Sequence, residues 1–179
     1  MDKMKNKFKP VIVELRPSKI TPKGVGVFAI TKMKKYTKVF EGIHMEDFKH
    51  MISWEEYRKL PKLTQQKIIA FCVGTPQGFV PPDNLDFNSL SIEWYLNHSC
   101  EGNVGFNNRG DFVTIKNIKS GDELTYDYRL VESNPKFKMQ CSCGTSKCSK
   151  LITGVDWKLL TNNPKKFQFM HPYLKKTSN

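Results

Sequence analysis

The pattern of apolar and polar positions predicts several short strands near the start of the chain. Residues 11–15 (VIVEL) form an apolar, β-branched run that ends at Arg16-Pro17, because proline interrupts a strand ladder. Strand-like runs continue through residues 36–43. Between these runs, Gly24 and Gly26 stand one residue apart after a proline turn, and a tight hairpin alone would explain them.

The second half of the chain repeats the β pattern. Residues 104–106 and 111–115 are apolar runs joined by the hairpin-turn sequence NNRG. Residues 124–128 (LTYDY) follow the turn sequence SGDE and have strand-like alternation, which would place Tyr126 and Tyr128 on one face. A mainly β (α+β) fold made of several small sheets is therefore expected.

Residues 44–90 show helical spacing in place of alternation. Ser53 can cap a helix that has two glutamates in its first turn. Three side chains recur at helical spacing after it: Trp54, Tyr57 and Leu60. A second helix is expected over residues 64–72, before a loop rich in proline and glycine. We expect the aromatic side chains of this segment to pack in the core.

Length and composition indicate one globular domain. The chain has 179 residues, of which 39% are hydrophobic, and no apolar run is long enough for a membrane span. Residues 1–9 are charged but precede no apolar segment, so a secretory signal is not expected. We therefore expect an intracellular protein with reduced cysteines, and the sequence does not choose between nucleus and cytoplasm.

The net charge of +12 indicates acidic partners such as nucleic acid. The lysines are scattered along the chain and form no single block. A general lysine bias with solvated charges accounts for the same composition, so the charge alone does not decide between the two.

Three cysteines form a dense cluster, Cys141, Cys143 and Cys148, in a C-x-C-x4-C spacing. Thiolates this close can share one tetrahedral ion, and soft sulfur ligands suit zinc. A fourth ligand must come from elsewhere in the chain. Free thiols are the alternative, but three so close together in a reducing compartment are hard to explain without a metal.

Residues 97–100 (NHSC) place an amide, an imidazole, a hydroxyl and a thiol directly after three bulky apolar residues. Buried polar groups require partners, so this run is either a satisfied turn in the core or part of a binding site. Residues 124–128 taken alone are an ordinary strand after a turn. Neither stretch decides the function by itself.

Together, residues 97–103 (NHSCEGN) and 121–128 (GDELTYDY) resemble the two signature motifs of the SET-domain protein-lysine methyltransferases. The resemblance covers residues 10–152. It implies a β-clip SET domain over 10–130 with an insert at about 44–90, a post-SET zinc segment over 137–152, and a C-terminal tail over 153–179. Gly102 departs from the usual proline, and Ser149-Lys150 departs from the usual Arg-Gly.

The resemblance also implies ligands and cofactors. Cys100 would complete one structural Zn²⁺ site with the three clustered cysteines, which leaves Cys72 as a core thiol. S-adenosylmethionine (SAM) would be the methyl donor. Its implied contacts are Lys23, Gly24, Val25, Gly26, Asn97, His98, Tyr128 and Leu151.

By the same resemblance, Tyr128 is the catalytic tyrosine and Tyr126 limits the product state, which favours mono- or dimethylation. The substrate would be a lysine-containing protein, with a histone as one candidate and contact with nucleic acid or nucleosomes as a further expectation. The alternative is a non-catalytic SET-fold module that binds chromatin or nucleic acid through its positive charge. The oligomeric state is not predicted.

Overall fold

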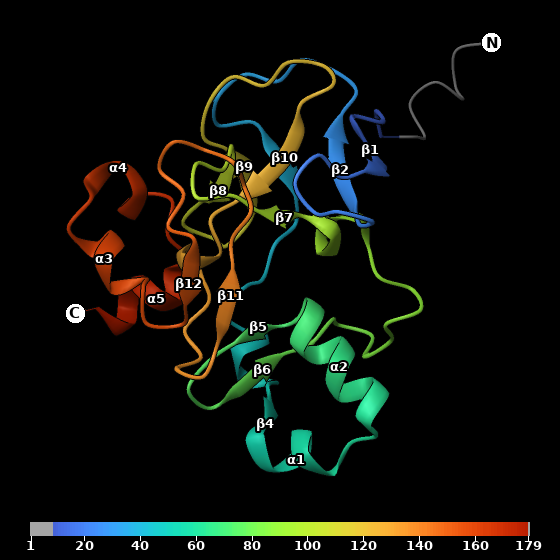
Figure 1. Cartoon of the computed structure of the whole chain (residues 1–179), viewed down its shortest axis with the longest axis vertical. Helices are drawn as coiled ribbons and strands as arrows, with labels where there is room; N and C mark the ends of the chain where they lie inside the picture. Colours follow the sequence, from blue (N-terminus) through green and yellow to red (C-terminus); the bar gives the residue numbers. More distant parts are fainter. Residues whose placement is uncertain (1–8, 179) are drawn as a thin grey trace.

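The computed structural model describes residues 9–178 and has a mainly β architecture (Figure 1). Within these residues, the largest sheet has seven strands in the order β1-β2-β10-β8-β9-β3, with β7 paired to β10. Its strands are β1 (Val13–Pro17), β2 (Val25–Ala29), β3 (Lys38–Phe40), β7 (Asn97–His98), β8 (Val104–Phe106), β9 (Phe112–Thr114) and β10 (Glu123–Tyr126). The mainly β fold of small sheets is confirmed.

Strand β10 joins the two halves of this sheet. It pairs antiparallel with β2 and parallel with both β7 and β8. The register places Thr125 opposite Asn97 and Tyr126 opposite His98, so the two signature stretches lie side by side. The Asn103 side chain fixes this arrangement, because its amide donates to the Glu123 carbonyl and accepts from the Thr125 N–H.

Several strand boundaries differ from the sequence prediction. The first strand covers Val13–Pro17 because its pairing with β2 begins at Val13 and ends opposite Val25. In the 36–43 run, only Lys38–Phe40 pairs as a strand, with β9. The run at 124–128 ends at Tyr126, because the Asp127 side chain caps a 3-10 turn, η3 (Tyr128–Leu130). Tyr128 therefore does not share a strand with Tyr126.

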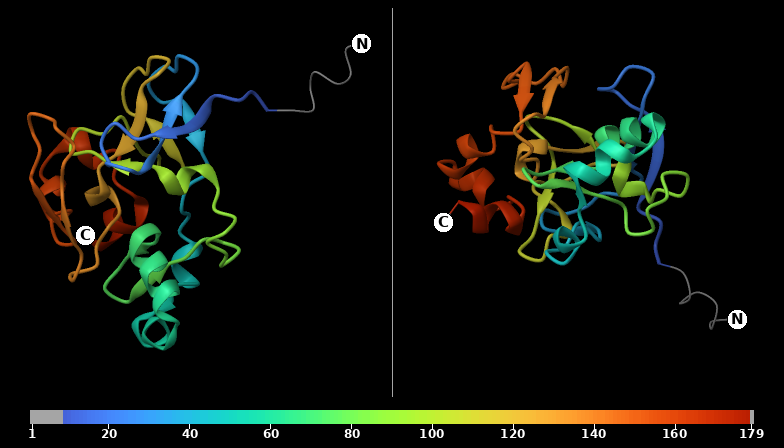
Figure 2. Two further views of the ribbon diagram at one scale, coloured as in Figure 1. Left: turned by 45° about the vertical axis from the view of Figure 1, so that its right-hand side comes forward. Right: turned by 90° about the horizontal axis from the view of Figure 1, so that it is seen from below.

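The insert forms a lobe below the main sheet in Figure 1 and in the left view of Figure 2. This insert lobe contains β4 (Ile52–Ser53), α1 (Trp54–Lys59), α2 (Lys62–Phe71), β5 (Val73–Gly74) and β6 (Gly78–Val80). The predicted Ser53 cap is confirmed as a capping box with Glu56. The aromatic side chains pack around Ile68 and Phe79 in a second core, as expected. The small sheet β4-β6-β5 was not predicted, because its two- and three-residue strands carry no alternation.

Short elements connect the sheet, the insert lobe and the C-terminal residues. The 3-10 turns η1 (Asp47–Lys49) and η2 (Ile92–Tyr95) flank the insert lobe. After η3, the chain forms β11 (Lys138–Gln140), β12 (Leu151–Thr153), α3 (Lys158–Thr161), α4 (Pro164–Phe167) and α5 (Pro172–Thr177). Among the described residues, no helix has the length and hydropathy that a membrane span requires. The charged N-terminal stretch lies, up to residue 8, outside the described residues.

The C-terminal residues belong to the main core. Trp157, Met170 and Leu174 are buried there. The predicted C-terminal tail is ordered at Lys175 and Lys176, which lie in helix α5. Long-range packing of Leu174 and its neighbours orders this helix, although its own sequence is strongly basic.

His171 links these C-terminal residues to the insert and gives a testable pH dependence. Its side chain is fully buried, and its Nε2 donates to the Ile43 carbonyl at 2.6 Å. Burial lowers the pKa of His171 to about 4. Between its ordinary pKa of about 6.5 and this value, the unfolded chain binds a proton that the folded chain does not, so the free energy of unfolding falls as pH falls.

We expect the titration of His171 to lower the free energy of unfolding by about 3 kcal/mol between pH 6.5 and pH 4. Urea unfolding of wild type and His171→Gln across this range measures it. The glutamine variant should be less stable at neutral pH, because it loses the buried ring, but its stability should depend less on pH. If the free energy of unfolding depended on pH equally in the two proteins, the lowered pKa of His171 would be contradicted.

Candidate active site

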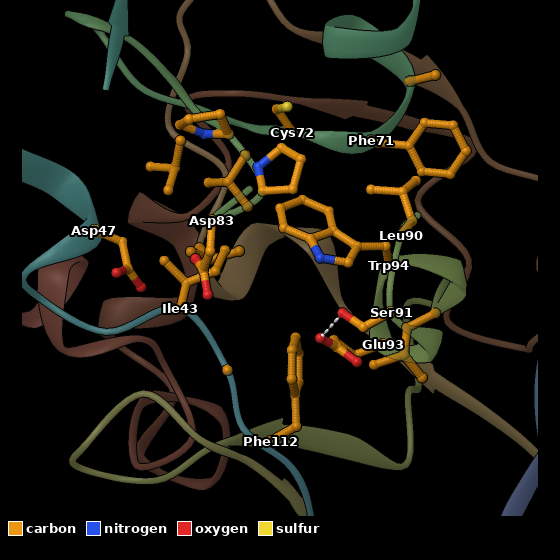
Figure 3. Close-up of a pocket in the computed structure, with 18 of the residues that line it drawn as sticks. Ile43, Asp47, Phe71, Cys72, Asp83, Leu90, Ser91, Glu93, Trp94 and Phe112 are labelled. Atoms are coloured by element: carbon orange, nitrogen blue, oxygen red, sulfur yellow. Dashed lines mark hydrogen bonds between the residues drawn. The ribbon is translucent and has the colours of Figure 1, made fainter. Parts of the chain in front are cut away.

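Two cavities meet beside Tyr128. The first, the aromatic cavity, has a volume of about 320 Å³ and lies between the insert lobe, β9 and β10. Its walls include Phe71, Trp94, Phe112 and Tyr126, several of which are seen in Figure 3. The second, the β11 cavity, has a volume of about 530 Å³. It is lined by Asn97 and His98 of β7, by the β11 segment, and by Cys141 and Ser142.

The tyrosines of the second signature stretch lie against each other at this junction. The ring centroids of Tyr126 and Tyr128 are 4.8 Å apart. Tyr126 lines the aromatic cavity alone, whereas Tyr128 lines both cavities. Desolvation raises the pKa of Tyr128 to about 12 and that of Tyr126 well above its ordinary value, so both phenols stay protonated near neutral pH. The Tyr128 hydroxyl donates to the Leu96 carbonyl at 3.0 Å.

His98 connects Tyr128 to the cysteine cluster. Its Nδ1 accepts the Tyr128 main-chain N–H at 3.1 Å, and its Nε2 lies 3.4 Å from the Cys100 sulfur. Burial lowers the pKa of His98 to about 4, so the imidazole is neutral and holds one proton, on the nitrogen that faces the sulfur. His98 therefore contacts both Tyr128, the candidate catalytic residue, and Cys100, a candidate metal ligand.

Four cysteine sulfurs converge next to this pair, from Cys100, Cys141, Cys143 and Cys148. All four lie within 4.8 Å of one another, and the sulfurs of Cys100 and Cys141 are 3.8 Å apart. A tetrahedral zinc with Zn–S bonds of about 2.3 Å requires neighbouring sulfurs to be roughly 3.8 Å apart. The donor set and its spacing therefore fit Zn²⁺. Cys72 lies apart from the cluster as a buried thiol, and burial raises its pKa to about 12.

The predicted SAM contacts occupy two layers. Asn97, His98 and Tyr128 line the β11 cavity, whereas residues 23–26 are not on its wall. The Asn97 amide donates to the Val25 carbonyl and to the buried Glu123 carboxylate. A Cβ at Gly26 would collide with Glu123, so glycine is required there for packing. Leu151 pairs with Gln140 in β12 and is not on the wall either, and its cofactor contact stays a prediction.

Comparison with known proteins assigns the family. The family model described as "SET domain" matches residues 24–129, which is more than half of the chain. This chain belongs to the SET-domain family. The matched segment includes β7, β10 and both tyrosines, so residues of the two cavity walls lie within it.

Curated relatives of this SET domain are similar over shorter segments. Histone-lysine N-methyltransferase ASHR3 of Arabidopsis thaliana is 38% identical over 61 residues, covering 30% of this chain and 12% of that protein. Histone-lysine N-methyltransferase ash1 of Drosophila melanogaster is 36% identical over 67 residues, covering 34% of this chain and 3% of that protein. The chain thus spans 12% or less of the length of these two relatives.

A solved structure shows a weaker likeness. It is a humanized mutant of the Chaetomium thermophilum Polycomb Repressive Complex 2 bound to the inhibitor GSK126. The match has a TM-score of 0.47 and 24% sequence identity, over 67% of this chain and 15% of that chain. At this level the likeness carries no argument, and the family assignment rests on the residues matched above.

In this SET domain, a buried network of charged side chains holds the second signature stretch, residues 121–128, at Asp127. The Asp127 carboxylate accepts two hydrogen bonds from the Arg129 guanidinium at 2.8 Å and one from the Lys166 ammonium at 2.6 Å. Burial acts to raise the pKa of Asp127, but Arg129 and Lys166 hold it below its ordinary value. The sequence indicated no role for Asp127. Its partner Lys166 lies 39 positions away, so local sequence carries no signal of the contact.

Besides Glu132, the aromatic cavity of the SET domain carries four carboxylates, from Glu41, Asp47, Asp83 and Glu93. Figure 3 shows Asp47 and Asp83 on one side of the Trp94 ring and Glu93 on the other, where its carboxylate accepts a hydrogen bond from the Ser91 hydroxyl. The sequence did not single out these residues, because they are spread over more than fifty positions. Although the protein is basic overall, these side chains make the wall of the aromatic cavity acidic.

Proposed function

We propose that this SET domain is a protein-lysine methyltransferase that transfers methyl groups from SAM. The observation that carries this proposal is the meeting of two cavities at Tyr128. One cavity would hold the donor and the other the lysine side chain, so that the two reactants approach from opposite sides. The β11 cavity, at about 530 Å³, lies in the usual size range for a cofactor site of roughly 300–1,000 Å³.

SAM, when bound, supplies a methyl group on a positively charged sulfur for in-line displacement by an amine. Asn97, His98 and the segment at Cys141 would hold it in the β11 cavity. The aromatic walls around Tyr126 favour the uncharged form of the incoming lysine, because burial disfavours the ammonium. The Tyr128 hydroxyl would orient the amine toward the methyl group, and such alignment can supply several kcal/mol.

The zinc segment would close one wall of this site. We propose one structural Zn²⁺ on the four cysteine sulfurs, with no part in the chemistry. Cys141 is both a metal ligand and a wall residue of the β11 cavity, so the ion would hold that wall in place. We also propose that SAM contacts Lys23, Gly24, Val25, Gly26 and Leu151.

For the substrate, we propose a lysine in a basic protein segment, such as a histone tail. The four carboxylates around the aromatic cavity support this choice, because they would attract flanking lysines and arginines. The names of the similar relatives, which are histone-lysine methyltransferases, agree with it. A nuclear location follows from that substrate as part of the proposal.

The test is methyl transfer from radiolabelled SAM to histones and to a cell extract, with zinc-loaded protein. We expect labelled protein bands that disappear when unlabelled SAM is added in excess. A protein that binds DNA with strong salt dependence but neither binds SAM nor transfers label would support the non-catalytic binding module instead.

Tyr126 gives a prediction for the product state. We propose mono- or dimethylation, because a hydroxyl at this place in the cavity can hold a water or the amine itself. Tyr126→Phe should shift the products toward trimethyl-lysine, with a roughly fivefold larger trimethyl fraction, since one hydrogen bond contributes about 1 kcal/mol. Mass spectrometry of a lysine peptide after exhaustive reaction measures this. An unchanged product distribution would show that Tyr126 does not set the product state.

A further inference from the structure

Glu132 lies where the aromatic cavity and the β11 cavity meet. Six residues line both cavities: Ile69, Ala70, Cys72, Tyr128, Glu132 and Phe137. Desolvation raises the pKa of the Cys72 thiol and of the Tyr128 phenol to about 12, so both remain neutral at physiological pH. Glu132 is therefore the one member of this described set whose side chain can carry a negative charge there.

The Glu132 carboxylate is held rigidly but keeps acceptor capacity. It is 7% exposed, and its oxygens accept the main-chain N–H groups of Gly74 and Asn134, each at 2.8 Å. A Cβ at position 74 would lie 2.7 Å from Glu132 Oε1, so only glycine permits this approach. Each carboxylate oxygen has two lone pairs, and these contacts use one on each. The remaining lone pairs are available to a group in the cavities.

The groups at the junction itself are apolar or neutral. The titratable ones are Cys72 and Tyr128, which line both cavities with Glu132, and Tyr126 of β10, and burial raises the pKa of each. Charged groups stand further along the two walls: Glu41, Asp47, Asp83 and Glu93 in the aromatic cavity, and Lys136 and Lys138 in the β11 cavity. In the described part of the chain, no lysine or arginine pairs with it. Burial raises the pKa of Glu132 to about 7, although its main-chain donors act to lower it. The carboxylate can thus gain and lose a proton near neutral pH.

A lysine side chain enters the aromatic cavity as an ammonium and must lose a proton before it can attack. We infer that Glu132 is the general base that accepts this proton, an inference that rests on the proposed methyl transfer. An N–H bond of the ammonium breaks and an O–H bond forms on the Glu132 carboxylate. The amine lone pair then forms the N–C bond to the methyl group of the sulfonium donor, and the C–S electron pair remains on the neutral thioether. Glu132 returns its proton to water when the products leave.

The other carboxylates of the aromatic cavity do not lie at its junction with the β11 cavity. Glu41, Asp47, Asp83 and Glu93 line the aromatic cavity but not the β11 cavity. They can attract a basic substrate, but they are not at the junction where the amine meets the donor. Glu93 is half-buried and carries the same functional group as Glu132, so Glu93→Gln is a matched control.

The experiment is the pH dependence of kcat for methyl transfer to a lysine peptide by wild type, Glu132→Gln and Glu93→Gln. For wild type, log kcat should rise with a slope of one and level off at an apparent pKa near 7, because kcat reports groups in the bound complex. Glu132→Gln should lower kcat by about 10²-fold at pH 7 and remove this inflection, so that the rate keeps rising toward higher pH. Glu93→Gln should raise KM for the peptide and keep the wild-type inflection.

A wild-type profile without an inflection near pH 7 would overturn the inference, and this result does not depend on any variant folding. An inflection that survives in folded, SAM-binding Glu132→Gln would overturn it as well. Either result can occur with methyl transfer intact, in which case the proposed function stands and only the role of Glu132 fails. Absence of transfer by SAM-bound wild type to every protein offered would reject the proposed function itself.

Discussion

Removal of the proposed zinc is expected to abolish SAM binding by this SET domain. Through that ion, the four sulfurs would tie residues 141–148 to Cys100, which is two residues from His98 and lies against its ring. Beyond the sulfurs, this segment is held mainly by the three-residue ladder between β11 and β12. Cys141 and Ser142 form part of the β11 cavity, so release of the segment removes a wall of the donor site. Metal binding energy in such sites is folding energy.

We therefore expect Cys148→Ser, or treatment with a strong chelator, to raise the Kd for SAM by at least about 100-fold. Zinc content by elemental analysis and SAM affinity by calorimetry measure the effect together. Cys72→Ala is the matched control, because Cys72 lies outside the cluster and should leave one zinc per chain. Full SAM affinity in metal-free protein would show that the cysteine segment does not hold the donor site.

Tyr128→Phe is expected to lower kcat by about 10²-fold, which corresponds to about 2.7 kcal/mol in the transition state. The variant keeps the ring that packs at 5.1 Å from the His98 ring, and it keeps the main-chain N–H bond to His98. It loses the hydroxyl that is proposed to orient the amine, and the Leu96 carbonyl loses its donor. Because the donor cavity is otherwise unchanged, Kd for SAM should change by less than about threefold.

Single-turnover methyl transfer to a lysine peptide measures this loss separately from substrate binding. Tyr95→Phe is a suitable control, since Tyr95 packs against Phe71 and lines neither cavity. It should retain the wild-type rate. A Tyr128→Phe enzyme within about twofold of wild type would contradict the proposed role of the hydroxyl.

The sequence predicted the parts of this structure that depend on local pattern. The C-x-C-x4-C spacing pointed to a shared metal because three thiols so close together in a reducing compartment are typical of a metal site, and their sulfurs do converge. The Ser53 cap is a local motif and was predicted correctly. The link from Cys100 to this cluster came from the family resemblance, since Cys100 and Cys141 lie 41 positions apart.

Features that depend on long-range contacts could not be predicted. Glu132 has no motif around it, and its significance comes from burial against Gly74, 58 positions earlier. The end of β10 at Tyr126 depends on the Asp127 carboxylate, which Arg129 and Lys166 hold in place. The C-terminal helices are held by core packing and by long-range contacts such as that between His171 and Ile43, which are 128 positions apart.

The central claim is that the β11 cavity of this SET domain binds SAM beside Tyr128. Calorimetric titration of zinc-loaded wild-type protein with SAM, beside Tyr128→Phe, tests it most directly. The account predicts one binding site per chain in both proteins, with similar affinity, because the hydroxyl acts in the transfer step. Absence of SAM binding by folded, zinc-loaded wild type would contradict the account.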